Sequence, residues 1–251
     1  MISLKTDAWR IDDIETVLFD KDGTIIDSHL YWGRIIERRA KALLLAYSLP
    51  CDYFAELCRV MGYSNSLKKL LPEGPIALVG REEVIDIINV YLTKNNIKSN
   101  IKQISDIFLI EHELFAKELF DYIEILPGIT DLLIKLKNNG IKTAVVTSDS
   151  VANTEIILAH LQINNYFDVI IGKESTTASK ITGIPVFKAL EYLHADSHGA
   201  VCIGDAPVDI IMALQSGCKA GVGVTTGQVP SEELLKHSLY VTSSIERIEI
   251  C

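Results

Sequence analysis

The chain lacks an excess of positive charge. Its 251 residues include 24 Lys and Arg against 33 Asp and Glu, which gives a formal net charge of −9. Nucleic-acid-binding proteins normally carry a basic surface, so no nucleic-acid partner is predicted. Because the overall field repels anions, an anionic substrate would need a local cation to bind.

Paired cysteines and long apolar runs are also absent. The five cysteines include no Cys-x-x-Cys pair, which favours reduced thiols over a disulfide framework. Met1–Asp13 contains no apolar signal region, and aliphatic runs such as Ala42–Ala46 are far shorter than the roughly 20 residues that span a membrane. We therefore predict a cytoplasmic protein without a membrane partner.

The chain does contain an alternation of strand and helix patterns. Helical patterns separate most of its short, nearly continuous apolar runs, which are typical of parallel strands covered on both faces. The runs are Thr16–Phe19, Lys142–Thr147, Asp168–Ile171, Ala200–Ile203 and Lys219–Val224. The alternation predicts an α/β fold with a doubly wound parallel sheet.

The segment from residue 28 to residue 120 does not follow this alternation. It contains amphipathic helical patterns but no convincing strand, and we expect Ser64–Gly80, with its two prolines and two glycines, to be a loop. The first helix carries a basic stripe that we interpret as a solvated face from which one arginine could reach a substrate. The stripe comprises Arg34, Arg38, Arg39 and Lys41.

The most informative stretch is Val17–Thr24, in which an apolar run is followed by Asp20 and, two residues later, by Asp22. Ligands of open α/β sheets bind beyond the carboxyl ends of the strands, where both carboxylates are expected. Two carboxylates this close repel each other, which favours a bound divalent cation or a shifted pKa. A site of this kind suits Mg²⁺, and an ordinary Asp-Gly turn is the alternative.

Polar residues follow later strands in the same way. Thr147 and Ser148 precede a helix whose N-terminus could bind phosphate, although capping of that helix is the alternative. Asp205 and Asp209 follow the fourth apolar run, where a capped helix start is again the alternative. Lys180, in a loop before a helix, is the candidate cation, although a lone lysine is usually only solvated.

In chain order, these motifs resemble those of the haloacid dehalogenase superfamily of phosphohydrolases. Asp20-x-Asp22-Gly-Thr24 is similar to the first motif of that family and Thr147 to the second. Lys180 is similar to the third, and Gly204-Asp205-x-x-x-Asp209 to the fourth.

This resemblance implies a chain of two parts. Residues 1–27 and 121–251 would form a Rossmann-like catalytic core around the parallel sheet. Residues 28–120 would form an inserted α-helical cap domain that closes over the site and selects the substrate.

The resemblance also implies hydrolysis of a phosphate ester through an aspartyl-phosphate. Asp20 would attack phosphorus, and Asp22 would protonate the leaving oxygen and then activate water. Thr147, Ser148 and Lys180 would bind the phosphoryl group.

Mg²⁺ is the cofactor that the resemblance implies. The side chains of Asp20 and Asp205 and the backbone carbonyl of Asp22 would hold it. Asp209 would be a further ligand or would orient the others.

The substrate stays open at this point. The implied partner is a small phosphorylated metabolite, with phosphoglycolate as one candidate, and the chain would act as a monomer or a homodimer. A sugar-phosphate mutase resembling β-phosphoglucomutase and a phosphonate hydrolase are the enzymatic alternatives. The non-enzymatic alternative is a phosphate-binding or signalling protein similar to bacterial receiver domains, although these are shorter and lack the Asp-x-Asp-Gly-Thr motif.

Overall fold

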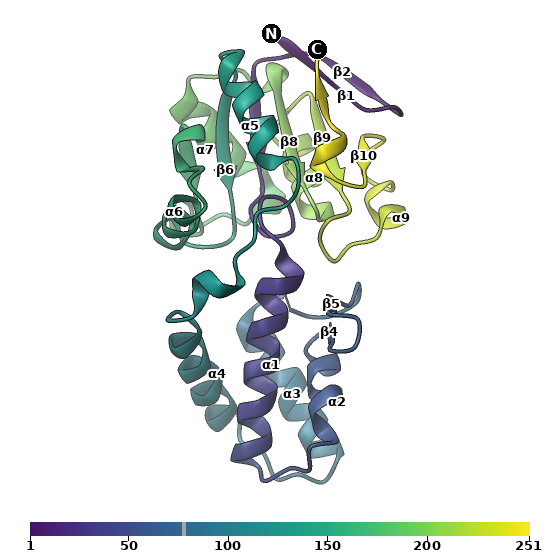
Figure 1. Ribbon diagram of the computed structural model, residues 1–251, viewed down its shortest axis with the longest axis vertical. Helices are drawn as coiled ribbons and strands as arrows, with labels where there is room; N and C mark the ends of the chain where they lie inside the picture. The colour runs from purple at the N-terminus through teal and green to yellow at the C-terminus, as the bar shows by residue number, and fades with distance from the viewer. Residues whose placement is uncertain (77–78) are drawn as a thin grey trace. The chain divides into compact units, whose positions relative to one another are not determined.

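The computed structural model describes residues 1–76 and 79–251 (Figure 1). The chain divides into two compact units, one formed by Met1–Asp27 and Glu124–Cys251 and the other by Ser28–Ile123. We call them the sheet unit and the helical unit. Within the described ranges, no helix is long and apolar enough to cross a membrane.

A six-stranded parallel sheet forms the centre of the sheet unit, with the strand order β10-β9-β8-β3-β6-β7. Its strands are β3 (Thr16–Phe19), β6 (Lys142–Val146), β7 (Val169–Ile171), β8 (Ala200–Gly204), β9 (Ala220–Val224) and β10 (Val241–Thr242). The predicted α/β fold is confirmed, and the ends of the five predicted strands are correct to within one residue. The two-residue strand β10 was not predicted.

Strand β3 lies between β8 and β6 at the centre of this sheet. All four of its residues are buried, which explains why the run is apolar without alternation. Phe19 pairs with Ile203 of β8 and with Val145 of β6. The amide of Asp20 continues the pairing by donating to the carbonyl of Ile203 at 2.9 Å, which fixes the chain where it leaves the sheet.

The helices of the sheet unit connect its parallel strands. They are α5 (Ile129–Asn138), α6 (Val151–His160), α7 (Ile184–Leu193), α8 (Pro207–Gln215) and α9 (Ser231–Leu234), with short 3-10 helices η2 (Asn164–Tyr166), η3 (Lys180–Thr182), η4 (Ser197–Gly199) and η5 (Ile245–Arg247). Val186 and Leu190 of α7 and Met212 of α8 belong to one buried cluster with Leu18 of β3 and Ala144 of β6. The apolar sides of α7 and α8 therefore cover the same part of the sheet.

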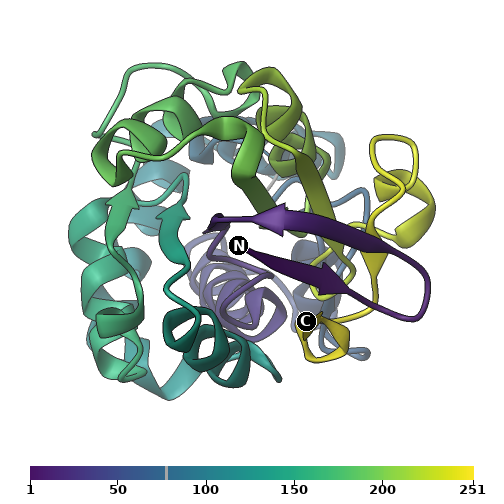
Figure 2. The same ribbon diagram turned by 90° about the horizontal axis from the view of Figure 1, so that it is seen from above.

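A second, antiparallel sheet in the order β11-β1-β2 was not predicted. Its strands are β1 (Ile2–Lys5), β2 (Arg10–Ile14) and β11 (Glu249–Ile250). Ser3 and Cys251 exchange backbone hydrogen bonds of 2.9 and 3.0 Å, so the two chain ends lie side by side (Figures 1 and 2). The strands were missed because they are short and because one of their pairings joins opposite ends of the sequence.

The described residues of the helical unit form four α-helices and a small hairpin. Its elements are α1 (Ser28–Ala46), α2 (Tyr53–Val60), β4 (Tyr63–Ser64), β5 (Lys69–Leu70), α3 (Arg81–Lys94), α4 (Ile101–Phe115) and the 3-10 helix η1 (Leu119–Tyr122). The expectation that this segment contains no strand is wrong, because β4 and β5 pair within the expected loop Ser64–Gly80 and just before it. Residues 77–78 of that loop lie outside the described residues.

The basic stripe of α1 is only partly solvated. Arg39 is 3% exposed, and its guanidinium carbon lies 4.3 Å from the centre of the Phe108 ring. Among the described residues, its Nε has no hydrogen-bond partner, and burial lowers the pKa of Arg39 to about 10. Arg38 differs, because it forms ion pairs of 2.9 Å with both Glu111 and Glu118. The interpretation of Arg39 as a solvated residue is therefore wrong.

We predict that Arg39→Met leaves the free energy of unfolding of the helical unit unchanged or raises it by about 1 kcal/mol. The substitution removes the cost of burying a charge, and the flexible thioether can keep the contact with Phe108. Urea unfolding can be followed through the fluorescence of Trp32, which lies in this unit, in a Trp9→Phe background.

Arg38→Met is the matched control, because it breaks real ion pairs and is expected to cost about 1 kcal/mol. A loss of more than about 2 kcal/mol for Arg39→Met would show instead that the Arg39 guanidinium stabilises the unit.

Candidate active site

Three carboxylates meet where β3 and β8 end. Asp20 follows β3, whereas Asp205 and Asp209 lie at and beyond the end of β8. One oxygen from each carboxylate lies within 4.8 Å of the others. The cause is the parallel pairing of the two strands, which brings their carboxyl ends to the same edge of the sheet. The structure therefore brings together three of the residues predicted from the sequence.

Lys180 joins two of these carboxylates. It begins η3, and its Nζ lies 2.5 Å from Oδ1 of Asp20 and 2.8 Å from Oδ1 of Asp209. Burial disfavours the ammonium form, but the adjacent carboxylates outweigh this effect and raise the pKa of Lys180. The predicted candidate cation is therefore a buried, charged partner of Asp20.

Asp209 is both a helix cap and a member of the cluster. Its Oδ2 accepts a hydrogen bond of 3.1 Å from the amide of Ala206 at the start of α8, while its Oδ1 accepts from Lys180. A Cβ atom at Gly204 would lie 2.2 Å from the Cβ of Asp209, so only glycine leaves room for this side chain. Asp209 therefore caps the start of α8, as the alternative interpretation expected, while its carboxylate also lies beside Asp20 and Asp205; its predicted role at the site stays a prediction.

The carboxylate of Asp205 lies in a cradle between two glycines. A Cβ atom at Gly227 would lie 1.7 Å from its Oδ2, and one at Gly23 would lie 2.5 Å from the same oxygen. The hydroxyl of Thr226 donates to the carbonyl of Gly23 at 2.5 Å and so joins the two loops that form this cradle. Across residues 1–76 and 79–251, no hydrogen bond or ion pair reaches the Asp205 carboxylate.

The donor set fits a divalent cation. Burial and the neighbouring charges of Asp20 and Asp209 raise the pKa of Asp205 well above its usual range. Burial also raises the pKa of Asp20, and Lys180 offsets this effect only in part. Among the residues that the structure describes, Lys180 is the one ammonium group paired with these three carboxylates, so the cluster carries excess negative charge. Carboxylate oxygens are the ligands that Mg²⁺ prefers.

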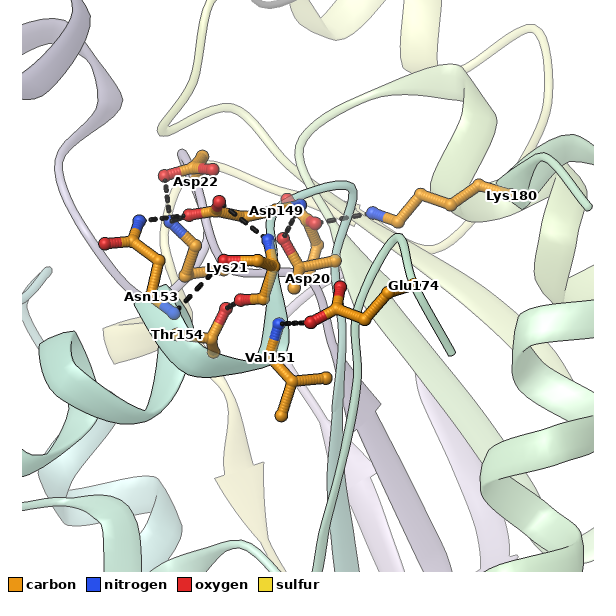
Figure 3. Close-up of polar contacts among 11 residues, drawn as sticks. Asp20, Lys21, Asp22, Asp149, Val151, Asn153, Thr154, Glu174 and Lys180 are labelled. Carbon is orange, nitrogen blue, oxygen red and sulfur yellow. Dashed lines mark hydrogen bonds and ion pairs between the residues drawn. The ribbon is translucent and has the colours of Figure 1, made fainter. Parts of the chain in front are cut away.

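The side chain of Asp22 does not join this cluster. Its Oδ1 accepts a hydrogen bond of 2.7 Å from Nζ of Lys21, which also lies 3.2 Å from Oδ2 of Asp149 (Figure 3). Burial raises the pKa of Asp22, and the charge of Lys21 partly offsets this effect. Sequence reasoning assigned no role to Lys21 or Asp149, since nothing in the local pattern shows that these two residues meet.

The residues that follow β6 have different environments. Thr147 is buried, and its hydroxyl oxygen accepts a hydrogen bond of 3.1 Å from the amide of Asp149. Ser148 is exposed. The cap of α6 is Ser150, whose hydroxyl accepts from the amide of Asn153 at 3.2 Å. Helix capping in this stretch therefore belongs to Ser150, and the roles predicted for Thr147 and Ser148 stay predictions.

Comparison with known proteins identifies the family of the chain. A family model described as haloacid dehalogenase-like hydrolase matches residues 14–217. The chain is 31% identical over 224 residues to a Caldanaerobacter subterraneus protein named "Putative pyrophosphatase PpaX", covering 89% of this chain and 87% of the relative. It is 26% identical over 211 residues to the phosphoglycolate phosphatase of Aquifex aeolicus, covering 84% and 85% of the two chains.

Solved structures show the same fold. A crystal structure from Haemophilus somnus, described as a predicted phosphoglycolate phosphatase, matches with a TM-score of 0.73 at 18% identity, covering 94% of this chain and 96% of the other. The β-phosphoglucomutase of Clostridium difficile matches with a TM-score of 0.60 at 24% identity, covering 93% and 92%. The resemblance predicted from the motifs is thus confirmed: the chain belongs to the haloacid dehalogenase-like hydrolase family.

Proposed function

We propose that the protein is a Mg²⁺-dependent phosphatase that hydrolyses a small phosphomonoester through an aspartyl-phosphate on Asp20. The observation that carries this proposal is the position of the Asp20 carboxylate, which lies 2.5 Å from a buried ammonium group and beside the carboxylate of Asp205. Membership of a hydrolase family and the phosphatase names of the relatives support it.

The carboxylates of Asp20 and Asp205 and the backbone carbonyl of Asp22 are the groups that would hold Mg²⁺. Bound there, the ion would supply positive charge to the carboxylates and to the phosphoryl group. Asp209 has both oxygens engaged, one by Lys180 and one by an amide of α8. We therefore assign Asp209 to the orientation of Lys180.

In the first step, an oxygen of Asp20 forms a bond to phosphorus while the bond from phosphorus to the leaving oxygen breaks. Asp22 gives its proton to the leaving oxygen. Lys180 favours the ionised form of Asp20 and offsets the charge of the phosphoryl group. The hydroxyl oxygen of Thr147 already accepts from Asp149, so its proton is available for a hydrogen bond to a phosphoryl oxygen.

In the second step, Asp22 takes a proton from a water molecule, whose oxygen attacks the phosphorus of the aspartyl-phosphate. The bond between phosphorus and Asp20 breaks, which releases inorganic phosphate and restores both carboxyl groups to their initial states. Four side chains on one sheet edge can perform both steps because phosphoryl transfer depends mainly on positioning and charge stabilisation.

The names of the relatives favour two substrate classes. One is a small phosphate ester such as phosphoglycolate, and the other is inorganic pyrophosphate. Selection between them by the helical unit, acting as a cap, is part of the proposal. The test is phosphate release from a panel of both classes and of hexose phosphates, with Mg²⁺ or with a chelator. Isomerisation of a sugar phosphate without net release would favour the mutase instead.

Asp20→Asn is expected to lower phosphate release from the best substrate by at least about 1,000-fold, because the amide cannot act as the nucleophile. Steady-state kinetics on the panel measures this loss. Asp7→Asn, which changes an exposed carboxylate, is the matched control and should retain full activity. An Asp20→Asn protein with more than a tenth of the original activity would refute the proposed nucleophile.

Asp22→Asn is expected to lower turnover by at least about 100-fold while part of the Mg²⁺ affinity survives. The reason is that the amide cannot transfer the proton, whereas the group offered to the metal is the backbone carbonyl. Calorimetric titration with Mg²⁺, beside turnover on the same preparation, separates the two effects. Loss of metal binding together with activity would contradict this assignment.

Gly227→Ala is expected to weaken Mg²⁺ binding by about 10-fold or more, because its Cβ would displace the carboxylate of Asp205. The same calorimetric titration measures this change. Gly80→Ala is the matched control, since a Cβ there would meet no atom of the described residues within 4 Å. Equal Mg²⁺ affinities for the two variants would show that Asp205 does not bind the ion.

A further inference from the structure

We propose that Lys21, anchored by Asp149, is the positioning residue that fixes the carboxyl group of Asp22 for proton transfer. The inference rests on the proposed function, because that function gives Asp22 its role. It gives a role to Lys21 and Asp149, which are not the proposed nucleophile, do not hold the metal and do not contact the phosphate.

Lys21 lies in the interior although it carries a charge. Its side chain is 0% exposed, and in the sequence it stands between Asp20 and Asp22. Its ammonium group lies 2.7 Å from Oδ1 of Asp22 and 3.2 Å from Oδ2 of Asp149 (Figure 3). Because the side chain is fully buried, it cannot serve as a surface cation that attracts the substrate. Its influence on the reaction must pass through the groups that it touches.

Asp149 is itself held in place at the start of α6. One of its oxygens accepts a hydrogen bond of 2.7 Å from the amide of Ser150. The other accepts one of 2.6 Å from Nδ2 of Asn153 (Figure 3). Burial alone would raise the pKa of Asp149, but the charge of Lys21 and these hydrogen bonds outweigh it and lower the pKa. Asp149 is therefore a charged anchor that is itself fixed by hydrogen bonds at the N-terminus of α6 in the sheet unit.

The contact with Lys21 leaves one oxygen of Asp22 available for proton exchange. Oδ1 is held by Lys21, whereas Oδ2 makes no hydrogen bond within residues 1–76 and 79–251, and the side chain is 21% exposed. The carboxyl group is thus fixed through one oxygen and can exchange a proton through the other. A proton donor that is already fixed loses less conformational entropy when the transition state forms.

The test uses the leaving group. An alkoxide leaving from an alkyl phosphomonoester needs a proton, whereas 2,4-dinitrophenolate leaves without one. The parameter kcat/KM covers the steps up to cleavage of the ester bond, so it isolates the first proton transfer. In Lys21→Met, we expect kcat/KM to fall by about 10- to 100-fold for the best alkyl substrate but by less than about 3-fold for 2,4-dinitrophenyl phosphate.

Three further variants separate positioning from folding. Asp149→Asn keeps Lys21 but weakens the ion pair that holds it. In this variant, kcat/KM should again fall more for the alkyl substrate, by about 3- to 10-fold, than for 2,4-dinitrophenyl phosphate. Lys21→Arg keeps the charge and should recover part of that activity. Lys142→Met removes a lysine that binds carbonyls at the other end of β6, and it should affect both substrates equally.

Equal losses on the two substrates in Lys21→Met and Asp149→Asn would overturn the positioning role. If Lys21→Met does not fold, which circular dichroism would show, the substrate dependence of Asp149→Asn alone decides. Asp20→Asn in the same assay keeps the two proposals apart. If Asp20→Asn loses activity on both substrates but the Lys21 and Asp149 variants show no difference between the substrates, only this inference is rejected. If Asp20→Asn retains activity, the proposed function is rejected.

Discussion

The crowding of carboxylates where β3 ends is the constraint on which the rest of the site depends. Charges that leave water must be paired, and unpaired ones are costly. Two buried ammonium groups meet this requirement, each bridging two carboxylates. Lys180 bridges Asp20 and Asp209, and Lys21 bridges Asp22 and Asp149. In the described part of the chain, no ammonium group forms an ion pair with Asp205, which is why the cluster fits a divalent cation.

The backbone permits this crowding because glycine occupies three positions at which a carboxylate lies against the main chain. A Cβ atom at Gly23 or Gly227 would collide with Asp205, and one at Gly204 would collide with Asp209. The charged groups can therefore approach each other at the edge of the sheet without distorting the strands. The same side chains also hold neighbouring segments together, because Lys180 connects η3 to the loop that follows β3 and to the first turn of α8. The same contacts therefore stabilise the sheet unit and position the groups of the candidate site.

Much of this arrangement could be predicted from the sequence. The parallel strands of the sheet unit are continuous apolar runs, and residues placed after such runs gather at one edge. That rule was sufficient to group Asp20, Asp205 and Asp209. Lys180 could be named as a candidate cation from its place in a loop before a helix, and the resemblance to a family motif supported that choice. Its contact with Asp20 could not be predicted, because the two residues are 160 positions apart.

Other features carry no local signal. The antiparallel sheet includes a pairing of β1 with β11, which lie near opposite ends of the sequence, so no short window contains both strands. The burial of Arg39 contradicts the usual exposure of arginine, because the ring of Phe108 covers it from another helix. Lys21 looks like a solvated residue of a turn, and Asp149 looks like part of a helix start. Only the three-dimensional fold shows that Lys21 and Asp149 form an ion pair.

The central claim is that Asp20 carries the phosphoryl group during turnover, and chemical trapping tests it most directly. Borohydride reduces an aspartyl-phosphate to homoserine, which peptide mass spectrometry locates. The protein would be mixed with Mg²⁺ and its best substrate, quenched with acid, reduced and digested. The account predicts homoserine at residue 20 and at no other position, and only when substrate is present. Trapping at a different aspartate, or unmodified Asp20 under conditions of rapid turnover, would contradict it.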